Sequence, residues 1–138
     1  MWLFYALLSA LFASLTAIFA KLGLSNINSN LATGIRTIVI LILIWVIIFV
    51  KGEFMEFNQI SKQNLGYLII SGIATGLSWL FYFKSLQIGN VSQVAAVDKL
   101  SVAITIILSI FIFKEVLSLK TAIGAALIII GTIVLAIK

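Results

Sequence analysis

The sequence predicts an all-α integral membrane protein with five transmembrane helices. Of its 138 residues, 63% are apolar and 9% are charged, whereas a typical soluble domain has about a quarter charged residues. A helix that crosses the hydrocarbon core of a bilayer needs about 20 mostly apolar residues. Five segments meet this requirement, and their approximate bounds are 2–20, 30–50, 65–83, 91–113 and 120–137. The short connections leave no room for a soluble domain, so residues 1–138 are predicted to form a single transmembrane domain.

The composition also limits the chemistry. The chain has no His and no Cys, which removes the usual zinc and haem ligands, thiol nucleophiles and imidazole bases. We therefore expect neither an enzyme nor a protein with a metal or another cofactor. The net charge of +5 is spread along the chain, so it does not indicate a nucleic-acid partner. Basic residues at the ends of apolar runs are typical anchors at an anionic lipid surface.

Small residues lie within the first, third and fifth spans. Thr16 belongs to a face of small residues in the first span, where it either supports close helix packing or lines a substrate cavity. Gly72 and Gly76 form a GxxxG pair in the third span, and Gly124 and Gly131 lie one heptad apart in the fifth. We expect these glycines to serve helix packing, within one chain or between two.

The third span ends in aromatic residues that precede Lys84. Trp79 and Tyr82 are either part of an aromatic belt at the membrane interface or a wall for a cationic or planar substrate. In the second interpretation Lys84 anchors the cavity or helps define its polarity.

The connection from Lys51 to Asn64 mixes aromatic residues with charges. We expect a short segment that lies on the lipid headgroups, with solvated charges and no chemistry.

Two charged groups lie inside predicted spans. A charge near the centre of a spanning helix costs roughly 2.5–3.5 kcal/mol on insertion scales. Arg36 is about six residues into the second span and Asp98 about seven into the fourth, and both spans start on the same membrane face. At 1.5 Å per residue both charges lie near a depth of about 10 Å, so an ion pair between them is geometrically allowed. Alternatively, Arg36 snorkels to the interface.

Lys99 needs a separate explanation. Successive helix positions are about 100° apart, so Lys99 is not expected to share the face of Asp98, whereas Ser101, three residues on, is. Lys99 either snorkels or pairs with Asp98, which would leave Arg36 for substrate. The chain has no Pro, so nothing in the sequence forces a kink in this span.

The basic residues of the loops do not choose an orientation. One face of the predicted topology carries four of them and the other carries three or four, which is almost no bias. A five-span chain has its termini on opposite sides of the membrane. Two copies inserted in opposite senses would form an inverted-topology pair, an arrangement on which many transporters are built.

Several segments of the chain match a known family pattern. They are LTAIFAKLGL (15–24), NLATGIRT (30–37), FYFKSLQIGNVSQV (81–94), VDKLS (97–101) and the closing FKEVLSLKTAIGAALIIIGTIVL. Together they resemble the EamA-like family of the drug/metabolite transporter (DMT) superfamily, and the resemblance covers nearly the whole chain. Larger members have ten helices in two inverted five-helix repeats, and this chain is similar to one repeat. The family pattern has a Pro just before the Asp-Lys pair, where this chain has Ala96.

The resemblance implies a secondary transporter, an exporter or exchanger of small metabolites or drug-like compounds, in a bacterial inner (plasma) membrane. It also implies that an antiparallel homodimer is the working unit. The first span lacks the acidic residue of the related four-helix exporters, which leaves Asp98 for any proton coupling. The alternative is a non-transporting accessory membrane protein that assembles with a larger partner through its GxxxG and Ser/Thr faces.

Overall fold

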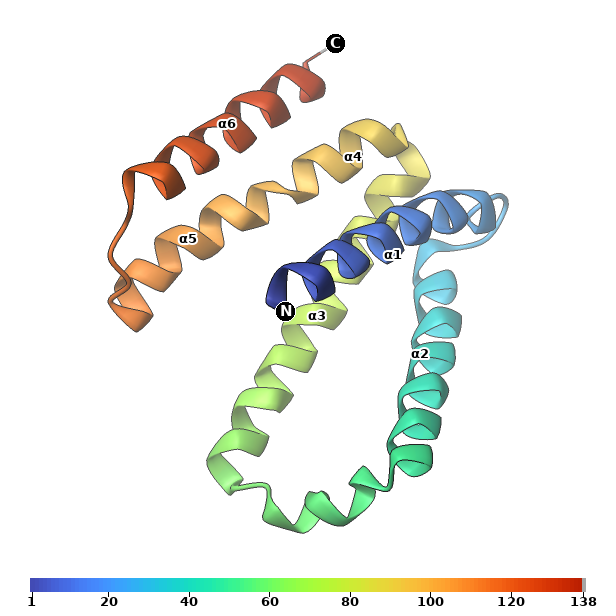
Figure 1. Ribbon diagram of the computed structural model, residues 1–138. Coiled ribbons are helices and arrows are strands. Elements are labelled where there is room, and N and C mark those ends of the chain that lie inside the picture. The colour runs from blue at the N-terminus through green and yellow to red at the C-terminus, as the bar shows by residue number, and fades with distance from the viewer. Residues whose placement is uncertain (138) are drawn as a thin grey trace. The chain divides into compact units, whose positions relative to one another are not determined.

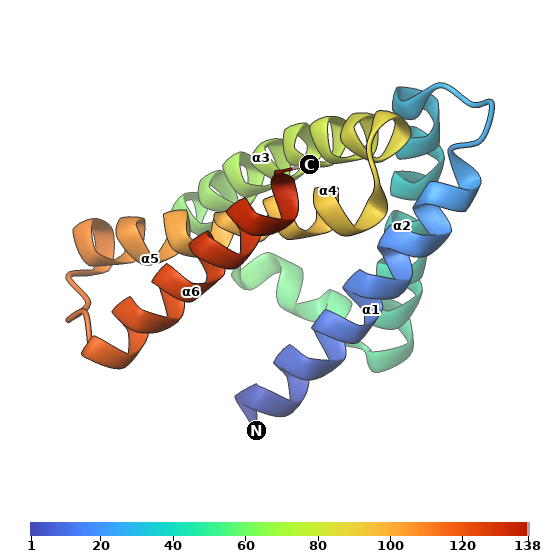
Figure 2. The same cartoon turned by 90° about the horizontal axis from the view of Figure 1, so that it is seen from above.

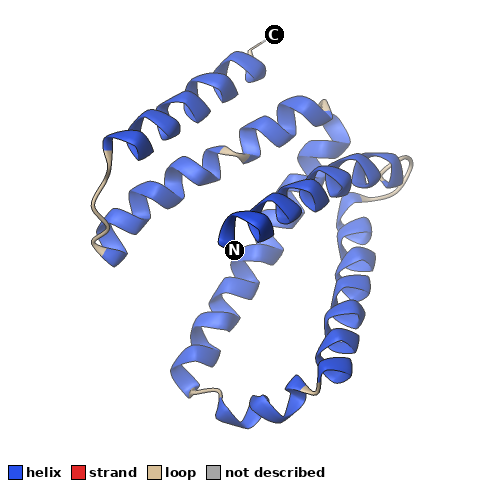
Figure 3. Ribbon diagram, in the orientation of Figure 1, coloured by secondary structure: helices blue, strands red, loops and turns tan. Residues whose placement is uncertain are grey.

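The described part of the chain, residues 1–137 without the side chain of Asn58, is helical and contains no strand in the computed structural model (Figure 3). The elements in order are α1 (Trp2–Gly23), α2 (Ser29–Lys51), the 3₁₀ helix η1 (Glu53–Gln59), α3 (Lys62–Ile88), α4 (Val91–Asp98), α5 (Leu100–Phe113) and α6 (Leu119–Ala136). Five stretches are long and apolar enough to cross a membrane: α1, α2, α3, α4 with α5, and α6. The predicted all-α class with five transmembrane helices is therefore confirmed.

The largest boundary difference concerns the third span. It was predicted at 65–83, but α3 extends from Lys62 to Ile88. Ser61 caps its start by accepting a hydrogen bond of 3.1 Å from the backbone N–H of Asn64. Hydropathy marks the part of a helix that fits the hydrocarbon core, whereas the helix itself continues into the polar interface on both sides.

Capping residues define other helix ends. Asn28 accepts a hydrogen bond from the N–H of Asn30 at the start of α2, and Ser118 accepts one from Thr121 at the start of α6. Gly52 ends α2 with a φ of 72°, and its N–H bonds to the carbonyl groups of the last turn. Glycine adopts this left-handed conformation without steric cost, so it allows the chain to turn directly from α2 into η1.

The chain divides into two compact units, of which the first contains Met1–Lys21 and the chain from Ile88 onward. Here α6 runs back beside α4 and α5, as Figures 1 and 2 both show. The Lys21 ammonium donates a 2.9 Å hydrogen bond to the carbonyl of Gly89 and so joins the end of α1 to the start of α4.

The second unit, Leu22–Gln87, contains α2, η1 and α3. Figure 1 shows α2 and α3 as two arms connected through η1. At the ends of α2 and α3 that lie away from η1, the Gln87 amide donates a 2.8 Å hydrogen bond to the carbonyl of Ile27, just before α2. This bond holds the start of α2 near the end of α3.

Most large apolar side chains are exposed in the chain, including those along the middle of every span. Among the described residues, burial is confined to a few positions, and the buried apolar residues are Ala17, Ala20, Leu24, Phe83, Leu86 and Ala103. A soluble protein could not leave so much apolar surface in water, whereas lipid tails cover it without cost.

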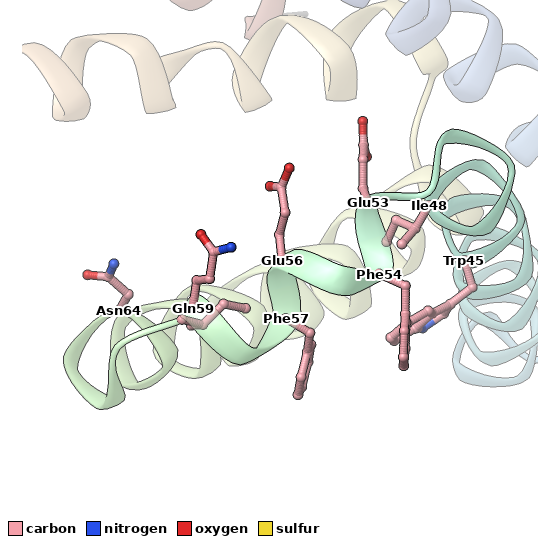
Figure 4. A pocket seen from close by; sticks show the side chains of 9 residues that line it. Trp45, Ile48, Glu53, Phe54, Glu56, Phe57, Gln59 and Asn64 are labelled. Atoms are coloured by element: carbon pink, nitrogen blue, oxygen red, sulfur yellow. The ribbon is translucent and has the colours of Figure 1, made fainter.

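The short helix η1 is amphipathic because a 3₁₀ helix has three residues per turn. Glu53, Glu56 and Gln59 point to one side, and Phe54 and Phe57 point to the other (Figure 4).

The aromatic side continues the end of α2. Phe54 stacks between Phe49 and Phe57, with ring centroids 5.3 and 6.3 Å apart, and Trp45 contacts the same cluster. A groove of about 420 Å³ lies between this cluster and the polar residues of η1. Aromatic rings on one side and carboxylates on the other fit a segment that lies at the membrane surface, as the sequence predicts.

We therefore predict an alternating labelling pattern along η1. Because the chain has no Cys, single-cysteine variants need no prior substitutions. In proteoliposomes, a membrane-impermeant maleimide present on both sides should label Glu53→Cys and Glu56→Cys several-fold faster than Phe54→Cys and Phe57→Cys. Equal labelling at all four positions would contradict the orientation of η1.

Candidate functional site

The fourth span is interrupted at Lys99, its ninth residue of 23. α4 ends at Asp98 and α5 begins at Leu100, with Lys99 in a turn between them. The N–H of Lys99 donates to the carbonyl of Ala96, and the N–H of Val102 donates to the carbonyl of Lys99, each at 3.0 Å. These bonds span three residues instead of four, which is the 3₁₀ pattern. The sequence contains nothing that forces a kink here, so this interruption is a finding of the structure.

Thr132 of α6 contacts the interruption. Its hydroxyl donates a 3.1 Å hydrogen bond to the carbonyl of Ala96, and the residue is only 5% exposed. A side chain that inserts into the hydrogen-bond ladder of a helix is one of the recognised causes of a kink. The last carbonyl groups of a helix lack partners within it, and here Ala96 receives both the N–H of Lys99 and the hydroxyl of Thr132.

Asp98 and Lys99 form an ion pair at the interruption. The Lys99 ammonium lies 3.6 Å from a carboxylate oxygen of Asp98, and both side chains are partly exposed. Of the two alternatives for Lys99, the structure thus contains the pair with Asp98. Ser101 follows in the first turn of α5 and is exposed. Its position on the face of Asp98 stays a prediction.

Arg36 occupies an aromatic site in the second unit. Its guanidinium lies over the ring of Phe83, 4.3 Å from the centroid, and 5.5 Å from the ring centroid of Trp79. Trp79 and Phe83 are four residues apart on α3, so their side chains share one face of that helix. Cation–π attraction of this kind contributes about 0.5–2 kcal/mol, more where water is excluded. We call Arg36, Trp79 and Phe83 the arginine site.

One nitrogen of this guanidinium lacks an acceptor. Arg36 Nη1 is buried and has no hydrogen-bond partner among the described residues. The neighbouring hydroxyl groups on α2 donate to their own helix, Thr33 to the carbonyl of Ser29 and Thr37 to the carbonyl of Thr33, both at 2.8 Å. A buried charged donor without an acceptor is costly, so this nitrogen requires a partner that the described residues do not supply.

Tyr82 also belongs to this region. Its ring meets Phe83 edge to face, with centroids 5.9 Å apart, and it interacts electrostatically with Arg36. The structure therefore brings three predicted site residues together: Arg36, Trp79 and Tyr82.

The other predicted residues lie elsewhere. Thr16 is half-buried on α1, and Lys84 is exposed, with its ammonium 3.5 Å from the side-chain oxygen of Gln87. Arg36 and Asp98 belong to different units, so their ion pair stays a prediction.

The glycines predicted to pack helices have open space around them. A Cβ added at any of these four positions would meet no atom within 4 Å, outside the backbone of its own helix, in the described part of the chain. Their packing role stays a prediction, and it needs a partner helix at Gly72, Gly76, Gly124 and Gly131.

Two residues of these sites were not among the candidate substrate contacts. Phe83 belongs to the aromatic run at the end of the third span and lies one helical turn beyond Trp79, so it shares its face. Thr132 had only its polarity as a signal, within a span that was interpreted as a packing helix. Its bond to Ala96 connects residues 36 positions apart, which a local pattern does not show.

We predict that the hydroxyl of Thr132 stabilises the first unit. Thr132→Val keeps the shape of the side chain but removes the donor, and such interhelical bonds in membrane proteins contribute about 0.6–2 kcal/mol. Thermal unfolding in detergent should show a lower midpoint for Thr132→Val and a nearly unchanged one for Thr132→Ser. A midpoint that is the same in all three proteins would contradict a role for this bond.

Comparisons with known proteins agree with this architecture. The family model described as "EamA-like transporter family" matches residues 1–137. The chain is 44% identical to a Sinorhizobium protein named "Uncharacterized transporter in cobO 3'region", over 99% of this chain and 96% of that protein. It is 33% identical to an uncharacterized protein of Methanocaldococcus jannaschii, over 96% of this chain and 93% of that protein. No solved structure matches. The chain is thus a multi-pass membrane protein that belongs to the EamA-like transporter family.

Proposed function

We propose that the protein is a secondary transporter of small metabolites or drug-like molecules, an exporter or exchanger, in a bacterial inner (plasma) membrane. Membership of a transporter family and the name of the Sinorhizobium relative support transport as such. The observation that carries the proposal is the interrupted fourth span, with Asp98 and Lys99 at the break. Ionisable residues inside the bilayer are typical of transport pathways.

The backbone of Lys99 stays helical, with a φ of −70° and a ψ of −9°, so the three-residue spacing tightens the helix here without unwinding it. Asp98 takes up and releases the coupling proton in this proposal. Protonation removes the negative charge that holds Lys99, so the 3.6 Å ion pair breaks and the turn between α4 and α5 is free to rearrange. Proton binding and a change in the helix are thereby linked through one interaction.

We further propose an antiparallel homodimer as the working unit. A single chain of five spans corresponds to one repeat, and an inverted pair of repeats is a common transporter architecture. The near-even distribution of basic residues between the loops on the two faces permits insertion in both senses. The open space beside Gly72 and Gly76 on α3 suits the close approach of a second helix.

A non-transporting accessory protein is the competing proposal. It uses the same glycine faces but binds a larger partner in one fixed orientation. An enzyme is disfavoured because the chain has no His or Cys and no nucleophile paired with a base can be named.

Transport should depend on the charge of Asp98. Proteoliposomes should accumulate at least one of three labelled, slowly permeating solutes, namely benzenesulfonate, benzyltrimethylammonium and alanine, faster than protein-free vesicles. Asp98→Asn keeps the side-chain size, but an amide does not carry a proton as a carboxylate does. The transport rate per folded molecule should therefore fall by about tenfold or more. Glu115→Gln, in the loop before α6, is the matched control and should transport like the parent. An unchanged rate in Asp98→Asn would remove Asp98 from the mechanism.

The dimer makes a separate prediction about topology. Single cysteines placed at each end of the chain should each be labelled from both sides of the membrane, because two copies insert in opposite senses. Crosslinking in membranes should yield a dimer. One fixed orientation together with monomers alone would contradict the antiparallel dimer and favour the accessory protein.

A further inference from the structure

The unpaired nitrogen of Arg36 has no carboxylate within reach in its own unit. Residues 22–87 contain two acidic residues, Glu53 and Glu56, and both lie in η1. α2 rises about 22 Å between Arg36 and Lys51, at 1.5 Å per residue, before η1 begins. These carboxylates therefore lie at the opposite end of the helix from the arginine site, and Glu53 pairs with Lys51 at 3.6 Å.

We propose that the arginine site binds the oxyanion group of the transported solute, so that the substrate is a small organic anion such as a carboxylate. This inference rests on the proposed transport function and deepens it by giving the sign of the substrate's charge.

The position of the guanidinium favours a negative charge on the substrate. The rings of Trp79 and Phe83 offer their negative faces to a cation, and Arg36 already occupies this place at 5.5 and 4.3 Å. An external cation would have to displace Arg36 and would meet its positive charge. The aromatic residues that the sequence associates with a cationic substrate therefore serve an arginine of the protein itself.

The geometry of the guanidinium suits an anion. The two rings lie 4.3 and 5.5 Å from the guanidinium carbon, and the five N–H donors of this planar group form a fork that matches the two oxygens of a carboxylate. Arg36 Nη1 is the donor that lacks an acceptor. An oxyanion at this edge satisfies the donor and neutralises the charge, and both effects are stronger in the low dielectric of a membrane.

The surroundings favour an anion with an apolar body. Trp79 is half-buried and its ring lies 5.5 Å from the guanidinium, so the solute meets aromatic surface beside the charge. A small amphipathic carboxylate offers both features.

Asp98 is the rival acceptor. It lies in the other unit and has its own counter-charge, because the Lys99 ammonium is 3.6 Å from its carboxylate. Lys99 therefore neutralises Asp98 without Arg36, whereas no carboxylate near Arg36 in its own unit neutralises the guanidinium.

The experiment uses Trp79 as a reporter in the full-length protein. Substituting Trp2→Phe and Trp45→Phe leaves Trp79 as the single tryptophan, because the chain has three. This parent, in lipid nanodiscs, is titrated with benzoate, with its neutral isostere benzamide and with the cation benzyltrimethylammonium. Benzoate should change the fluorescence saturably, and the other two should not. Benzoate should also raise the thermal unfolding midpoint, which is a second and independent readout.

Substitutions of Arg36 then test the site itself. Arg36→Gln should raise the dissociation constant for benzoate by about tenfold or more, and Arg36→Lys, which keeps the charge but loses the fork, should raise it by less. Lys62→Gln removes an exposed cation at the other end of α3 and should bind benzoate like the parent. If Arg36→Gln does not fold, Arg36→Lys carries the test, and unchanged affinity in that variant would overturn the proposal.

Three other results would also overturn it. They are no benzoate binding by the parent, equal binding of benzyltrimethylammonium, and benzoate binding that emerges only after Asp98→Asn, which would make Asp98 the acceptor. Failure of the transport function is recognised separately. Benzoate binding without flux of any solute contradicts transport, whereas flux of a cation without benzoate binding contradicts only the anion site.

Discussion

Inside a bilayer, every backbone polar group and every charge has to be satisfied by the protein itself, since no water is at hand. This constraint explains both polar sites of the chain. The carbonyl of Ala96, at the end of α4, is satisfied by Thr132 from a different helix. The carboxylate of Asp98 is satisfied by its neighbour Lys99. Arg36 is half-satisfied, with rings on its face and one nitrogen unpaired. The first site is thus satisfied from within the chain, whereas one donor of the arginine site has no acceptor among the described residues.

The fold was predictable because it follows from length and hydropathy. A membrane span has to be about 20 residues long and apolar, so five spans were evident in the sequence and all five are found. The ends of the spans were less predictable. α3 continues through polar residues as far as Ile88 because its last turns are held by contacts such as that of Gln87 with Ile27, which hydropathy does not measure.

The sequence indicated which residues belong to the sites, but not which residues they contact. Arg36, Trp79 and Tyr82 stood out as polar or aromatic residues within spans, and the structure brings them together. The contact of Arg36 with Phe83 joins residues 47 positions apart, so no local spacing reveals it. The break at Lys99 was not predicted either, because the span contains no proline or glycine, and the threonine that contacts the break lies on another helix.

The hydrogen bond from Thr132 also makes α6 more than a packing helix. Gly131, where a second copy would pack against α6, lies next to Thr132 in the chain. Thr132 in turn bonds to Ala96 at the break. Any rearrangement at the break that stretches this bond also changes the energy of α6. Linkage makes any such coupling reciprocal: a partner whose docking against α6 changes the strength of this bond binds more tightly or more weakly by the same free energy when the break rearranges.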